Sequence, residues 1–182
     1  PQDNGNFNVI VETTKYVECT FGQFLAKSRS KKFVIYSDIA GSGKSWMLTK
    51  IAENLKFQFP THWIFFIQLS DFISKFEELQ NLNIDEISFL DIIKIHFMPS
   101  KTETEKRIFE RFFNEGKVFL FMDGFDEICP KNKEIGLRIL SKFNQRTSNQ
   151  VFITIRPHLE NDLSSVLNES IVFNFKRWNK EE

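Results

Sequence analysis

The chain has 182 residues, enough for one α/β domain with a substantial core, and its 24 basic and 24 acidic residues cancel. A net charge of zero gives no electrostatic support for a nucleic-acid partner or a membrane-surface partner. The two widely separated cysteines and the lack of a long apolar run exclude a disulfide framework and a membrane span, and favour a cytoplasmic protein.

Helices and strands are predicted to alternate after a lead-in or linker over residues 1–15. Apolar runs predict five buried strands, at 33–37, 63–69, 118–122, 151–155 and 171–175. Apolar residues at helical spacing predict helices at 20–28, after residue 45, near 87–94, at 103–115 and at 133–146. This alternation predicts an α/β fold of three layers, in which helices cover both faces of a five-stranded parallel sheet.

A phosphate-binding loop is predicted at residues 38–45, which read Asp-Ile-Ala-Gly-Ser-Gly-Lys-Ser between a strand and a helix. Small residues let backbone N–H groups surround a phosphate, and the helix N-terminus adds positive potential. In such a Walker A motif, Lys44 would reach the β- and γ-phosphates and the Ser45 hydroxyl would hold Mg²⁺. We assign nucleotide contacts to seven consecutive residues: Ala40, Gly41, Ser42, Gly43, Lys44, Ser45 and Trp46.

The loop departs from the usual Gly-x-x-x-x-Gly-Lys-Ser/Thr pattern at its first position, where Asp38 replaces glycine. Aspartate tolerates unusual backbone angles better than most residues, but it places a negative charge near the polyphosphate. A scaffold whose loop no longer binds nucleotide therefore stays open as an alternative.

Acidic residues follow the third predicted strand, in Asp123-Gly124-Phe125-Asp126-Glu127. An acid at the end of a buried strand is costly unless a cation or a hydrogen-bond donor satisfies it. Beside a phosphate loop, Asp123 would serve the Mg²⁺ shell directly or through water, and Glu127 would orient or deprotonate the attacking water. Asp126 would hold either partner or accept hydrogen bonds from the neighbouring loop. The alternative is a solvated surface turn.

The fourth predicted strand ends in Thr154-Ile155-Arg156-Pro157. An arginine at this tip would sense a γ-phosphate through a charge-assisted hydrogen bond, although pairing with Asp126 or Glu127 competes with that role. Because ligands bind at the carboxyl ends of parallel strands, we expect the segments 38–45, 123–127 and 154–157 to form one site.

Taken together, the segments 40–45, 119–127 and 154–157 resemble the NACHT domain, the nucleotide-switch NTPase of NOD-like receptors and related signalling proteins. The resemblance covers residues 16–178, and we expect 179–182 to begin a helical subdomain of a longer protein. It implies a P-loop sheet with an extra strand between the phosphate-loop strand and the acidic strand. It also implies nucleotide and Mg²⁺ binding by Lys44, Ser45 and Asp123, hydrolysis through Glu127, and a sensor role for Arg156.

The resemblance further implies the cofactors ATP or ADP with Mg²⁺, and a switch in which ADP holds a closed monomer and ATP promotes self-association of the full-length protein. Signalling in innate immunity or cell death, through partners that the sequence does not identify, would follow. Without subdomains that supply further contacts, we expect slow ATP hydrolysis. The alternatives are a motor or chaperone of the AAA type, with rapid turnover, and a P-loop kinase of a small molecule.

Overall fold

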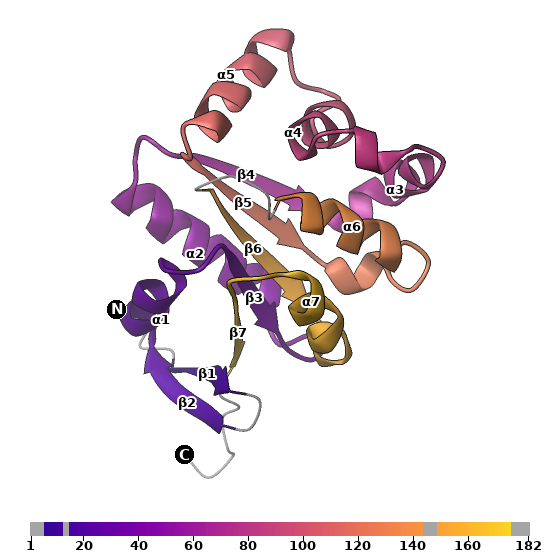
Figure 1. Cartoon of the computed structure of the whole chain (residues 1–182). Coiled ribbons are helices and arrows are strands. Elements are labelled where there is room, and N and C mark those ends of the chain that lie inside the picture. Colours follow the sequence, from indigo (N-terminus) through magenta and orange to yellow (C-terminus); the bar gives the residue numbers. More distant parts are fainter. Residues whose placement is uncertain (1–5, 13–14, 144–148, 176–182) are drawn as a thin grey trace.

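The computed structural model describes residues 6–12, 15–143 and 149–175. At its centre lies a seven-stranded sheet with the strand order β2-β1-β7-β3-β6-β5-β4 (Figure 1). Five neighbouring strands run parallel: β7 (Ser170–Phe175), β3 (Phe33–Ser37), β6 (Gln150–Ile155), β5 (Val118–Asp123) and β4 (Trp63–Gln68). The predicted five-stranded parallel sheet is confirmed, and β6 is the extra strand between β3 and β5.

Two further strands extend the sheet where a lead-in was expected. β1 (Asn6–Glu12) pairs antiparallel with β7, and β2 (Lys15–Thr20) pairs antiparallel with β1. The alternating apolar residues Phe7, Val9 and Val11 suit a strand. Because the partner β7 lies near the other end of the chain, no local pattern reveals the pairing that makes this segment part of the sheet.

Helices cover both faces of the sheet and complete three layers (Figure 1). One face carries α1 (Phe21–Ser28) and α2 (Lys44–Gln58). The other face carries α3 (Ile73–Gln80), α4 (Phe89–Ile92), α5 (Glu103–Asn114), α6 (Lys133–Phe143) and α7 (Glu160–Val166). Along β5 the side chains alternate between the two cores, since Leu120 and Met122 face α3–α7 whereas Phe121 faces α1 and α2.

Phenylalanine supplies much of both cores, as its 22 occurrences in the chain lead one to expect. On the α2 face, the rings of Phe121 and Phe152 stack with their centroids 4.7 Å apart and an interplanar angle of 7°. On the other face, Phe33 and Phe143 form an edge-to-face pair with their ring centroids 5.5 Å apart. Such aromatic pairs add to the free energy gained from burial alone. Phe57 is an exception, because 87% of it is exposed at the end of α2.

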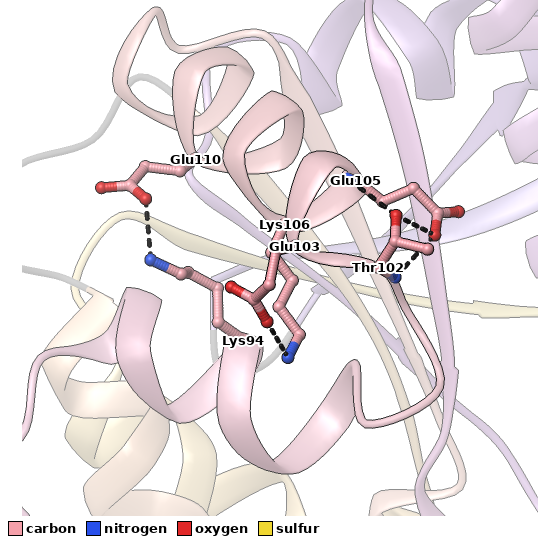
Figure 2. Close-up of polar contacts among 6 residues, drawn as sticks. All are labelled: Lys94, Thr102, Glu103, Glu105, Lys106 and Glu110. Atoms are coloured by element: carbon pink, nitrogen blue, oxygen red, sulfur yellow. Dashed lines mark hydrogen bonds and ion pairs between the residues drawn. The ribbon is translucent and has the colours of Figure 1, made fainter.

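The helix predicted near residues 87–94 is divided in the structure, because α4 continues directly into a π-helix, η3 (Ile93–Phe97). An ion pair of 2.7 Å between Lys94 and Glu110 connects η3 to α5 (Figure 2). Thr102 and Glu105 form a capping box at the start of α5, each side chain accepting the other's backbone N–H. On α5, Ile108 is 42% exposed, whereas Phe109 and Phe113 are buried.

Gly136 in α6 provides a stability test of the contact between this helix and the acidic loop. A Cβ atom at Gly136 would lie 2.9 Å from Cε2 of Phe125, a fully buried ring in the 3₁₀ turn η4 (Phe125–Ile128). We expect Gly136→Ala to reduce the free energy of unfolding by about 1–3 kcal/mol, because the ring must move within a packed core. Urea unfolding followed by circular dichroism measures this change.

Gly22→Ala in α1 is the matched control, since nothing lies within 4 Å of a Cβ atom at Gly22. Removing a glycine from a helix with open space around it is expected to raise the free energy of unfolding by about 0.5–1 kcal/mol. Equal effects of the two substitutions would contradict the tight packing at Gly136.

Candidate functional site

The parallel register brings three chain segments to the same edge of the sheet. β6 lies between β3 and β5, with Ser37 opposite Ile155 and Met122 opposite Ile153. The next residue after β3, Asp38, donates its backbone N–H to the carbonyl oxygen of Ile155 over 3.2 Å. The phosphate loop, the acidic loop and the Arg156 segment therefore all begin at one edge, as predicted for a ligand site of a parallel sheet.

The phosphate loop turns through two glycines with left-handed backbone angles and enters α2 at Lys44. The φ angle is 75° at Gly41 and 87° at Gly43, in a region that residues other than glycine rarely adopt. The first backbone N–H groups of α2 have no partners within the helix and form a positive end that suits an anion. The Lys44 ammonium donates to the carbonyl oxygens of Asp38 and Ile39, both at 2.8 Å, and so arches over the loop.

Asp38 fits the loop without backbone strain. Among the described residues, Glu169 is the only non-glycine with a positive φ, so Asp38 does not need the backbone freedom of the glycine it replaces. Its carboxylate accepts the backbone N–H of Ile39 at 2.7 Å, and the residue is only 7% exposed. Burial, and after it the nearby charge of Asp38, raises the pKa of the Tyr36 phenol. The hydrogen bond from the Ile39 N–H partly compensates the buried charge of Asp38 within its own loop.

The hydroxyl of Thr154 fixes the position of Asp123. Thr154 Oγ1 donates to Asp123 Oδ1 and accepts the backbone N–H of Gly124 at 2.7 Å. Asp123 is 2% exposed, and its second oxygen, Oδ2, is buried without a hydrogen-bond partner. An unpartnered carboxylate oxygen is rare in a protein interior and calls for a cation or a water as its ligand.

Gly124 allows the acidic loop to fold tightly against Glu127. Its φ angle is 79°, and a Cβ atom here would lie 2.9 Å from Cδ of Glu127. The backbone N–H of Glu127 donates to the carbonyl oxygen of Gly124 at 2.9 Å, which closes the turn. Glu127 itself is exposed, whereas Asp123 is buried, so the two acids face different surroundings.

Arg156 pairs with Asp126, the alternative that the sequence left open. The distance from Arg156 Nε to Asp126 Oδ2 is 2.7 Å. The Asp126 side chain is 8% exposed and the Arg156 side chain 50% exposed. The pair therefore joins a buried carboxylate to a guanidinium whose outer part reaches solvent.

Two buried oxygens without hydrogen-bond partners belong to residues that the sequence assigned to the site, Ser42 Oγ and Asp123 Oδ2. This donor set fits a phosphate and a hard divalent cation, which prefers oxygen ligands. The part of the chain that the structure describes contains no cluster of three or more His, Cys, Asp or Glu suited to a metal. A Mg²⁺ site of one carboxylate and one hydroxyl needs no such cluster, because phosphate and water supply the other ligands.

Trp46, the last residue assigned to the phosphate loop, is 52% exposed, with the Lys50 ammonium 5.9 Å from its ring centroid.

One contact beside the site escaped the sequence prediction. The Ser37 hydroxyl at the end of β3 donates to the Glu160 carboxylate at the start of α7. The contact ties the segment after Arg156 to the phosphate-loop strand. Because 123 positions separate the two residues, no local pattern could have signalled it.

The model of the NACHT domain family matches residues 34–182, more than half of the chain. The chain therefore belongs to the NACHT family, and it is a P-loop NTPase module of the kind found in signalling proteins. A comparison with curated proteins finds no match. Within the described residues, no helix combines the length and apolar character needed to cross a membrane.

Thr154→Val tests the role of the bridging hydroxyl. The substitution keeps the shape of the side chain but leaves Asp123 Oδ1 and the Gly124 N–H without their shared partner. We expect the free energy of unfolding to fall by about 1–3 kcal/mol, the cost of leaving buried polar groups unpaired. Chemical denaturation measures the loss. Thr154→Ser, which keeps the hydroxyl, should lose much less, and an equal loss in both variants would contradict the bridge.

Proposed function

We propose that this chain is an ATP/ADP-binding switch module, with slow ATP hydrolysis, of a multidomain intracellular signalling protein. One observation carries the proposal: two unpartnered buried oxygens, on Ser42 and Asp123, belong to loops that leave the same sheet edge as the anion-binding end of α2. A phosphate chain with its cation is the ligand whose charges complement this set.

In this proposal the phosphate loop and the acidic loop bind different parts of a Mg²⁺-nucleotide. Backbone N–H groups from Ala40 to Trp46 would surround the phosphates, and Lys44 would add a positive charge. Ser45 and Asp123 would hold Mg²⁺, which supplies charge neutralisation between the β- and γ-phosphates when bound. Asp123 is suited to this task because Thr154 already fixes its other oxygen.

Hydrolysis would depend on Glu127, the exposed acid that lies against Gly124. From this position its carboxylate would orient or deprotonate an attacking water. An additional arginine supplied by another segment or subunit is worth roughly 10³–10⁵ in kcat, so we expect slow turnover by this chain alone. This expectation separates the switch from an AAA-type motor.

Switching would use Arg156 as the sensor of the γ-phosphate. Moving an equilibrium from 1:99 to 99:1 takes about 5.5 kcal/mol of differential binding, more than one arginine contact supplies. Contacts from the rest of a full-length protein would provide the remainder. We propose that the ATP-bound full-length protein self-associates in the cytoplasm, and that its signalling serves innate immunity or cell-death control.

The Lys44→Ala variant tests nucleotide binding directly. Removing the ammonium should weaken binding of Mg²⁺-ATP by about a hundredfold or more, since a charged hydrogen-bond partner of the phosphates is lost. Isothermal titration calorimetry with ATP and ADP measures both affinities. Unchanged affinity in Lys44→Ala would overturn the phosphate-loop assignment.

Asp38→Gly distinguishes the switch from a scaffold without nucleotide. Because Asp38 is unstrained and hydrogen-bonded within its own loop, we expect the native chain to bind nucleotide, with Asp38→Gly changing the affinity by less than about tenfold. The same calorimetric titration provides the comparison. Binding by Asp38→Gly but not by the native chain would favour the scaffold.

Glu127→Gln tests hydrolysis separately from binding. The amide keeps the shape of the side chain but cannot accept a proton, so ATP turnover should fall by about 10²-fold or more while ATP affinity is retained. Phosphate release under single-turnover conditions measures the rate. A fast steady-state rate in the native chain would contradict the switch and favour a motor.

A further inference from the structure

Arg156 is held at its backbone from two sides. Its carbonyl oxygen accepts the N–H of Leu159 at 3.0 Å, in the 3₁₀ turn η5 (Pro157–Leu159). The preceding residue, Ile155, is bound to the phosphate loop through the N–H of Asp38, and Glu160 is bound to Ser37. The main chain at Arg156 is therefore fixed relative to β3, and the direction of its guanidinium depends on the side chain.

Asp126 determines that direction by contacting one particular nitrogen. The ion pair uses Nε of Arg156, the nitrogen closest to the main chain, at 2.7 Å from Asp126 Oδ2. Among the contacts of the described residues, none involves the two terminal nitrogens of Arg156. A guanidinium is a planar fork of five N–H donors. A contact at Nε therefore restrains the plane of the group and leaves the terminal N–H groups available to bind an anion.

The two partners of the pair differ in what they need from each other. The Asp126 side chain is 8% exposed, so without Arg156 it would be a buried charge with no counter-ion, which is strongly unfavourable. The Arg156 side chain is 50% exposed, so without Asp126 water would still solvate it. Asp126 therefore does little for the solvation of Arg156, and its effect on that residue is to restrict its conformations.

We propose that Asp126 is a positioning residue for Arg156, and that the pair gives the site its preference for ATP over ADP. The inference rests on the proposed nucleotide function. Asp126 does not touch the nucleotide; it holds Nε so that the terminal nitrogens of Arg156 face the place of the γ-phosphate. An arginine already fixed in its binding conformation loses less conformational entropy when a phosphate oxygen binds. ADP, which lacks the γ-phosphate, does not benefit.

The test measures the affinities of the whole chain for Mg²⁺-ADP and for the Mg²⁺ complex of a non-hydrolysable β,γ-imido analogue of ATP, by calorimetry. We expect Asp126→Ala to weaken binding of the analogue by about tenfold and to leave the ADP affinity within about twofold. Asp126→Asn, which keeps the shape of the side chain but removes its negative charge, should show an intermediate loss. In the double variant Asp126→Ala/Arg156→Ala, the analogue should bind with about the same affinity as ADP.

Asp162→Ala is the control, because Asp162 also forms an ion pair, with Lys133 at 3.1 Å between α6 and α7, and its side chain is 36% exposed. It should leave the ratio of the two affinities unchanged. Equal weakening of ADP and analogue binding in Asp126→Ala would indicate a merely structural or metal-binding role and would overturn the inference. Unchanged affinities for both nucleotides would overturn it as well. Failure of the native chain to bind either nucleotide would instead overturn the proposed function, and this inference with it.

Discussion

The parallel pairing of β6 between β3 and β5 is the constraint on which the site depends. Parallel strands point their carboxyl ends the same way, so the segments that follow them are brought together however far apart they are in sequence. This register places Thr154, on the middle strand, beside the acidic loop, where its hydroxyl forms hydrogen bonds with both Asp123 and the Gly124 backbone. A slip in the pairing of β6 would separate Thr154 from Asp123 and detach Arg156 from Asp126.

The two aromatic cores make that register specific. Side chains of β5 and β6 alternate between the faces, and a shift by one residue would exchange the two sets. The stacked pair of Phe121 and Phe152 joins β5, which ends in Asp123, to β6, which Arg156 follows. On the opposite face, Phe125 of the acidic loop belongs to the core under α3–α7 and lies against Gly136. The position of the acids at the sheet edge is therefore secured from the hydrophobic interior.

Asp38 shows how a departure from a motif depends on local geometry. In the phosphate loop the left-handed positions are Gly41 and Gly43, which the sequence retains. Asp38 occupies a position where a side chain can be accommodated, and the Ile39 N–H partly compensates its buried charge. Asp38, the departure from the motif in the sequence, thus has an ordinary structural role in the loop.

The sequence by itself determined the central parallel sheet, the phosphate loop and the identity of the acids and the arginine, because each rests on a local pattern of apolar runs, glycines and charges. The tertiary structure decided which partners those groups meet. Whether Arg156 contacts Asp126, whether Thr154 supports Asp123, and whether β1 joins β7 all depend on segments far apart in the chain. Local patterns record the propensity of a segment, whereas such contacts are set by the register of the sheet and by packing around it.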